Sequence, residues 1–132
     1  MRALVTLIIG LVAGVLFTVI AMNTLRKGTA YPNGVMAVMS AQLVQLDQRL
    51  KAEACSKDDL ASNLQTLAAL GNDIEPAFLP TADDVMFSTY AGDYRAAVDR
   101  ALAVPAASCA DADKALDAIN ATCTACHTQF KS

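Results

Sequence analysis

The sequence predicts an all-α protein, an up-down-up-down antiparallel four-helix bundle preceded by an N-terminal transmembrane or signal helix. Three observations predict this fold. The 132 residues include no Trp and few aromatic, Gly or Pro residues, which argues against a β-sandwich. The opening segment is apolar and uncharged after Arg2. The remainder repeats a helix-capping pattern three times, each time followed by apolar residues at helical spacing, and is long enough for one core.

Residues 3–22 form a run without a charge, an Asn or a Pro, and a short polar tether over residues 23–30 follows it. As a helix the run would be about 30 Å long, which matches the hydrocarbon core of a bilayer. A secretory signal usually has a shorter apolar stretch and a small-residue cleavage site, so an uncleaved anchor over residues 1–22 is favoured. A cleaved signal and a buried core helix are the alternatives. The flanking basic residues are nearly balanced and do not orient the run.

The bundle domain is expected over residues 31–132, and its first helix should end near Ala54. The tetrapeptide Tyr31-Pro32-Asn33-Gly34 has the chemistry of a helix start. An apolar seam follows at spacings of three and four residues, as one face of an α-helix requires. Its members are Met36, Met39, Leu43, Leu46 and Leu50.

The second helix begins at a capping box, in which Ser56 and Asp59 satisfy each other's backbone donors. Its leucines recur as far as Gly71, which is a natural C-terminal stop. Residues 72–80 contain two prolines and a Phe-Leu pair, and we expect a loop there. The leucine positions are Leu60, Leu64, Leu67 and Leu70.

Two further capping patterns predict the third and fourth helices. Thr81 and Asp84 cap the third helix, which ends before Pro105, and Ser108 and Asp111 cap the fourth. Short connections make neighbouring helices antiparallel. The two seams are Phe87, Tyr90, Tyr94, Ala97 and Ala101, and then Ala112, Leu116, Ile119, Cys123, Cys126 and Phe130.

This topology places Cys55, in the first connection, and Cys109, in the third, at the same end of the bundle. The helical lengths agree, because Met36 to Cys55 spans about 28 Å and Cys109 to His127 about 27 Å. We therefore expect Met36 and His127 to meet at the opposite end. A structural disulfide between Cys55 and Cys109 is expected, since an exported domain permits one, and two unpaired thiols are the alternative.

The other two cysteines stand in Cys123-Thr124-Ala125-Cys126-His127, the C-x-x-C-H pattern of covalent haem c attachment. On a helix these three positions share one face, so two sulfurs can form thioethers to haem while the imidazole binds the iron from the same side. Structural buried cysteines, a thioredoxin-like redox pair and a zinc site are the alternatives. The redox pair lacks its β-α-β context, and the zinc site lacks a second histidine.

A four-helix bundle with this motif near its carboxyl end resembles the cytochrome c′ family and its low-spin, methionine-ligated relatives, over residues 31–131. The family opens its first helix with a segment like Y-R-x-x-x-M, which Tyr31 and Met36 match. Pro32 replaces the family's arginine, a cation expected near the haem. Lys131 matches a basic residue four positions after the haem histidine.

The resemblance implies one covalent haem c, with Cys123 and Cys126 as attachment sites, His127 as proximal ligand and Met36 facing the sixth side of the iron. Met36 could instead be an ordinary core residue, as methionines at seam spacing often are. The segment Phe78-Leu79-Pro80 is similar to the family's loop after the second helix. The expected haem pocket includes Met39, Phe78, Phe87, Tyr90 and Lys131.

The state of Met36 separates two functions. If its sulfur binds the iron, a six-coordinate, low-spin haem suits an electron-transfer protein, which is the function we expect. If it does not, a five-coordinate haem with an apolar distal pocket would bind small gases such as nitric oxide or carbon monoxide. Enzyme activity is not expected, because no second histidine or placed carboxylate offers acid–base chemistry at the haem.

Charge and targeting restrict the partners. All 13 acidic residues follow Tyr31 but only seven of the ten basic ones do, so the bundle is acidic and nucleic-acid binding is not expected. Unidentified redox proteins with basic docking faces are the expected partners. The expected location is the periplasmic side of the bacterial inner membrane, anchored by residues 3–22, or the soluble periplasm after signal cleavage. Family members often pair through their first two helices, and the sequence fits both a monomer and a homodimer.

Overall fold

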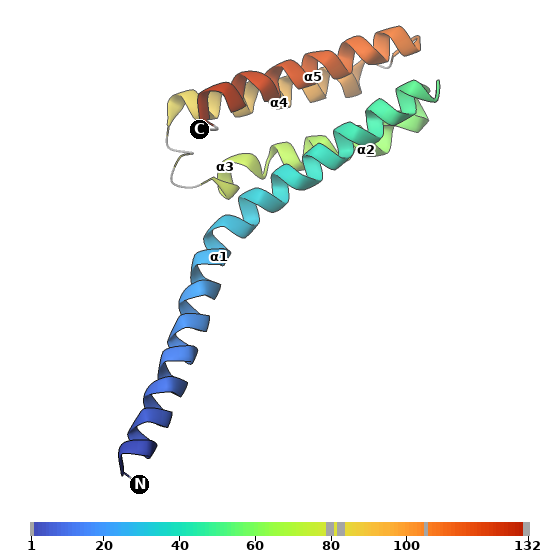
Figure 1. Ribbon diagram of the computed structural model, residues 1–132. Coiled ribbons are helices and arrows are strands. Elements are labelled where there is room, and N and C mark those ends of the chain that lie inside the picture. The colour runs from blue at the N-terminus through green and yellow to red at the C-terminus, as the bar shows by residue number, and fades with distance from the viewer. Residues whose placement is uncertain (1, 79–80, 82–83, 105, 131–132) are drawn as a thin grey trace. The chain divides into compact units, whose positions relative to one another are not determined.

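A computed structural model describes residues 2–78, 81, 84–104 and 106–130, with the backbone alone described at residues 2–9 and 22–29. The chain divides into two compact units, residues 1–33 and 34–132. The helices are α1 (Arg2–Lys51), α2 (Lys57–Gly71), α3 (Ile74–Ala77), α4 (Val85–Ala103) and α5 (Cys109–Phe130) (Figure 1).

The first unit consists of the opening turns of α1. Its described apolar side chains are exposed, with Phe17 75 % and Leu11 65 % accessible to solvent. Within the residues that the structure describes, no helix has the length and hydropathy that a membrane crossing requires. The predicted anchor, residues 3–22, lies partly outside the residues whose side chains are described. The tether predicted over residues 23–30 belongs to the same helix.

The helix start predicted at Tyr31 is wrong, because α1 continues through Pro32. A proline inside a helix removes one backbone donor and its ring crowds the carbonyl four residues earlier, but the hydrogen-bond ladder of α1 resumes after Pro32. The end of α1 at Lys51 lies three residues before the predicted end at Ala54. The seam of this helix is nearly as predicted: Met39 and Leu46 are buried, and Val35, which the seam omitted, is buried as well.

The second unit is an all-α bundle, as predicted, in which α4 packs against α5, α2 and α3. Figure 1 shows α4 and α5 side by side in opposite directions, with the C-terminal end of α5 at the end where α3 lies. Polar side chains join α1 to α2, because the buried Asn63 amide donates to Gln42 Oε1 at 2.7 Å and to Gln45 Oε1 at 2.9 Å. The interior is formed mainly by apolar residues: Val35, Met39, Leu46, Leu60, Leu67, Ile74, Phe87, Ala91, Tyr94, Ala97, Val98, Ala112, Leu116 and Ile119.

Two of the predicted caps are confirmed. The reciprocal capping box of Ser56 and Asp59 starts α2, and the Ser108 hydroxyl accepts the Asp111 backbone N–H at the start of α5. The third cap is shifted by three residues, because Asp84 rather than Thr81 is the N-cap of α4 and accepts the Met86 N–H at 2.7 Å. Both residues suit an N-cap, so sequence alone does not choose between them.

The predicted loop over residues 72–80 contains the one-turn helix α3. Pro76 stands inside that turn, where the backbone donors have no helical partner in any case. The connection is therefore partly helical. Phe78 is the C-cap of α3 and lies at the end of the bundle.

The predicted end of α2 at Gly71 is confirmed, but for a different reason. No glycine among the described residues adopts a positive φ, so Gly71 does not form the left-handed stop that its position suggested. A Cβ atom there would lie 3.1 Å from both the Tyr94 ring and the Arg95 side chain. Gly71 therefore allows α4 to approach α2 closely.

The predicted disulfide is present. Cys55 and Cys109 are bonded, with their Cα atoms 5.1 Å apart, and join the connection after α1 to the first residue of α5. The expectation from helix lengths, that these two residues meet at one end of the bundle, is confirmed.

Candidate functional site

The last turns of α5 carry the two remaining cysteines and the histidine. Cys123 and Cys126 are free thiols and half-buried, whereas the His127 side chain is exposed. All three lie within one uninterrupted helix, so the sulfurs are one turn apart on the same face, about 4.5 Å along the axis. The motif thus forms a single patch with two soft donors and one imidazole.

The two thiols are not chemically activated. Burial raises the pKa of Cys123, and the neighbouring Cys126 raises it further, although a hydrogen bond with Thr122 lowers it. Burial also raises the pKa of Cys126. A redox-active dithiol usually contains a cysteine with a lowered pKa, and the pKa of both thiols is shifted in the opposite direction.

Tyr94 on α4 lies near Cys123. Its hydroxyl donates to the Leu67 carbonyl oxygen at 3.1 Å, and this hydrogen bond joins α4 to α2. Burial raises the pKa of the Tyr94 phenol, and its electrostatic interaction with Cys123 acts in the same direction. The helical spacing predicted Tyr94 in the seam of its helix, but its proximity to Cys123 arises from the packing of α4 against α5.

An aromatic cluster, which consists of Phe78, Phe87, Tyr90 and Phe130, adjoins the motif. The Phe87 ring lies 5.7 Å from Phe78 and 5.3 Å from Phe130, and the Tyr90 ring lies 6.0 Å from Phe130, between ring centroids. Three of the four were predicted as pocket residues, and the structure brings them together. Phe130 was predicted only as a seam residue, although its position three residues after His127 places it next to the motif.

The methionines of α1 have different environments. Met39 is buried at 5 % exposure, and Met36 is half-buried and packs against the edge of the core. Met39 is therefore a core residue, while the predicted bond between the Met36 sulfur and iron stays a prediction. Lys131, Leu79 and Pro80 lie outside the described residues.

The donor set suits a c-type haem. Two unpaired, partly accessible thiols one turn apart can form two thioethers, and the exposed imidazole can bind iron from the same side. The aromatic cluster offers the apolar surroundings that a porphyrin requires. Cys55 and Cys109 are joined to each other, so neither completes a zinc site with the motif. Over the described part of the chain, no three His, Cys, Asp or Glu side chains are grouped to hold a metal ion.

Comparisons with known proteins support the fold. No protein-family model matches the chain, and no curated protein matches it. Among solved structures, it is similar to cytochrome c′ from Rubrivivax gelatinosus, with a TM-score of 0.64 at 18 % sequence identity. The match covers 78 % of this chain and 93 % of the other. The predicted resemblance to cytochrome c′ is thus confirmed at the level of the fold.

Proposed function

We propose that this chain is a c-type cytochrome that carries one covalent haem and transfers electrons. The observation that carries the proposal is the placement of two free thiols and one imidazole on a single face of the last turns of α5, in a bundle with the cytochrome c′ fold. A bound haem would supply reversible one-electron oxidation and reduction.

Each residue of the motif has a definite role in this proposal. Cys123 and Cys126 would hold the haem through two thioether bonds, each formed by addition of a thiol S–H across one vinyl group, so the linkage would need no oxidant. His127 would bind the iron through an imidazole nitrogen. Phe87 and Tyr90 would keep water from the porphyrin.

Met36 is proposed as the sixth ligand. It is half-buried on the bundle part of α1, whereas Met39, one turn later, is enclosed in the core. A histidine–methionine pair would raise the reduction potential of the haem, which suits an electron carrier. Without the Met36 bond, the same site would be five-coordinate and would bind nitric oxide or carbon monoxide.

The periplasmic side of a bacterial inner membrane is the proposed location, with residues 3–22 as the anchor. Two observations support it: the exposed apolar side chains along residues 10–20 of α1, and the Cys55–Cys109 disulfide, which persists in oxidising compartments. Redox proteins with basic docking faces are the proposed partners, because acidic residues outnumber basic ones in the bundle.

The visible absorption spectrum of the purified holoprotein tests the proposed function. We expect a ferrous form with sharp, separate α and β bands that carbon monoxide does not change, because Met36 fills the sixth position. A broad high-spin spectrum that carbon monoxide sharpens would overturn electron transfer in favour of gas binding. A spectrum without haem absorption would overturn both functions.

A further inference from the structure

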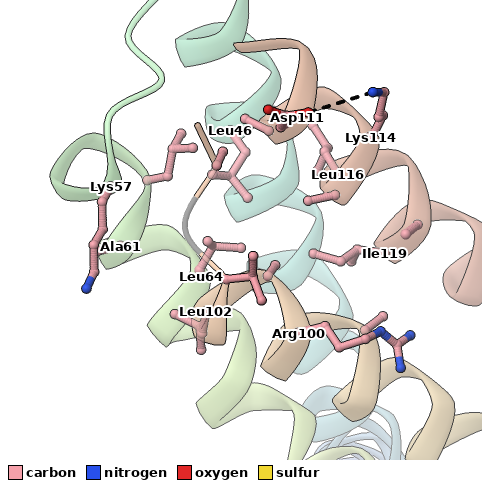
Figure 2. Close-up of a pocket in the computed structure, with 18 of the residues that line it drawn as sticks. Leu46, Lys57, Ala61, Leu64, Arg100, Leu102, Asp111, Lys114, Leu116 and Ile119 are labelled. Carbon is pink, nitrogen blue, oxygen red and sulfur yellow. Dashed lines mark ion pairs between the residues drawn. The ribbon is translucent and has the colours of Figure 1, made fainter. Parts of the chain in front are cut away.

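A pocket of about 720 Å³ lies in the half of the bundle nearer the disulfide. Its walls come from the last turns of α1 and α4 and from the first turns of α2 and α5 (Figure 2). Small-molecule sites usually measure about 300–1,000 Å³, so this volume is sufficient for a ligand. The pocket contains none of the residues assigned to the haem site, and its interpretation does not rest on the proposed function.

The interior of this pocket is aliphatic. Among the described residues that line it there is no aromatic side chain, so a planar ligand would find no stacking surface. Alanines alternate with leucines along the walls and leave room that larger residues would fill. A flexible saturated chain fits such a surface best. The aliphatic lining includes Leu46, Leu60, Leu64, Leu116 and Ile119, with Ala101 and Ala115 between them.

The edge of the pocket is cationic. Lys57, Arg100 and Lys114 belong to the lining, and Asp111 is its one acidic member among the described residues. The Asp111 carboxylate lies 3.7 Å from the Lys114 Nζ atom and accepts a hydrogen bond from the Ser108 hydroxyl, so its negative charge is already compensated. Neither Lys57 nor Arg100 has an ion pair within the described part of the chain. Figure 2 shows the nitrogen atoms of Lys57 and Arg100 at the outside of the group, and the leucines toward its middle.

This positive edge stands out because acidic residues outnumber basic ones in the bundle. An apolar interior with unpaired cations at the margin matches a molecule with one long chain and one anionic end. Of the two unpaired cations, an arginine can hold a carboxylate through two parallel hydrogen bonds, whereas a lysine offers a single point of charge.

We propose that this pocket binds one long-chain fatty acid, with the alkyl chain between the leucines and alanines and the carboxylate at Arg100.

The test uses the full chain, purified in one non-ionic detergent, and a fluorescent single-chain fatty acid displaced by palmitate. We expect saturable binding of one probe per chain. Ala101→Phe, which fills the pocket, and Arg100→Gln should each weaken binding about tenfold or more. The matched controls are Ala121→Phe, at an exposed position of α5 outside the pocket, and Lys51→Gln, which removes an equal charge from an exposed lysine that does not line the pocket. Both should bind as the unchanged chain does, and hexadecanol should displace the probe about tenfold less well than palmitate.

Three results would overturn the proposal. One is the absence of saturable binding. Another is equal binding by Ala101→Phe and the unchanged chain, which would place the probe elsewhere, for example on the exposed apolar side chains of residues 10–20. The third is binding by Arg100→Gln that is no weaker than binding by Lys51→Gln. Far-UV circular dichroism checks that each variant folds, and if Ala101→Phe does not fold, the two charge variants decide alone.

Discussion

The four cysteines of this chain occupy two different chemical environments. Cys55 and Cys109 are bonded at one end of the bundle, whereas Cys123 and Cys126 are free and half-buried on one face of α5. Spacing along the chain separates the two pairs, because Cys123 and Cys126 lie one helical turn apart, whereas the stretches from Met36 to Cys55 and from Cys109 to His127 have similar helical lengths. Helix geometry, the C-x-x-C-H motif and the expected export of the domain together predicted the two pairs, with two unpaired thiols at Cys55 and Cys109 as the alternative.

The two methionines of α1 provide a matched test of iron ligation. Met36→Ala should convert the low-spin spectrum into a high-spin one that responds to carbon monoxide, because the thioether ligand is lost. Met39→Ala should keep the low-spin spectrum but lower the free energy of unfolding by about 2–5 kcal/mol, because it leaves a cavity in the core. Absorption spectra and urea unfolding measure the two effects. An unchanged spectrum in Met36→Ala would contradict ligation by this residue.

Tyr94 predicts a dependence of stability on alkaline pH. Burial raises its pKa in the folded protein, so the folded state holds a proton that the unfolded chain releases above pH about 10. Its contribution to stability should be complete below that pH and should decline as the pH rises further. Tyr94→Phe should remove this decline, and at pH 7 it should cost about 1 kcal/mol, because the Leu67 carbonyl loses its donor. Urea unfolding at pH 7 to 11 measures both, and equal slopes for the two proteins would count against this role.

At the scale of single elements, sequence patterns predicted helices well where the signal was local. The capping box of Ser56 and Asp59 and the cap at Ser108 depend on side chains three residues apart, and both are present. The start of α4 was placed three residues too early, because Thr81 and Asp84 both have capping chemistry. The start at Tyr31 was wrong because a proline that suits a first turn is also tolerated within α1.

Contacts between elements were less predictable. Gly71 suits a helix end, but its role depends on Tyr94 and Arg95, which follow more than twenty residues later. Asn63 is buried in an α2 seam of leucines, and its side-chain amide donates to Gln42 and Gln45 of α1. Such contacts depend on how two helices pack together, and the apolar period of a single helix does not predict them.

The corrected start of α4 is directly testable. Asp84→Ala should lower the free energy of unfolding by about 1 kcal/mol, because the Met86 N–H loses its acceptor. Thr81→Ala is the matched control and should change stability little, since it lies three residues before the N-cap. Urea unfolding measures both variants. A larger loss in Thr81→Ala than in Asp84→Ala would restore the start that the sequence suggested.

At the scale of the whole molecule, the bundle separates two regions along its length. The C-terminal turns of α5 carry the thiols, the imidazole and Phe130, and the opposite half carries the disulfide and the aliphatic pocket. The fold and the C-x-x-C-H motif could be predicted because both are periodic or contiguous in sequence. The pocket could not, because it depends on how closely four helices pack, and the same leucines and alanines would also suit a filled core.

The intact mass of the purified chain tests the central claim, covalent haem on Cys123 and Cys126, most directly. We predict a mass ~616 Da above that of the polypeptide, retained after denaturation, since two thioether bonds hold the group. The double variant Cys123→Ser/Cys126→Ser should lose this increment, and Cys55→Ser/Cys109→Ser should retain it. A mass equal to the polypeptide alone, from cells that attach haem to other c-type cytochromes, would contradict the account.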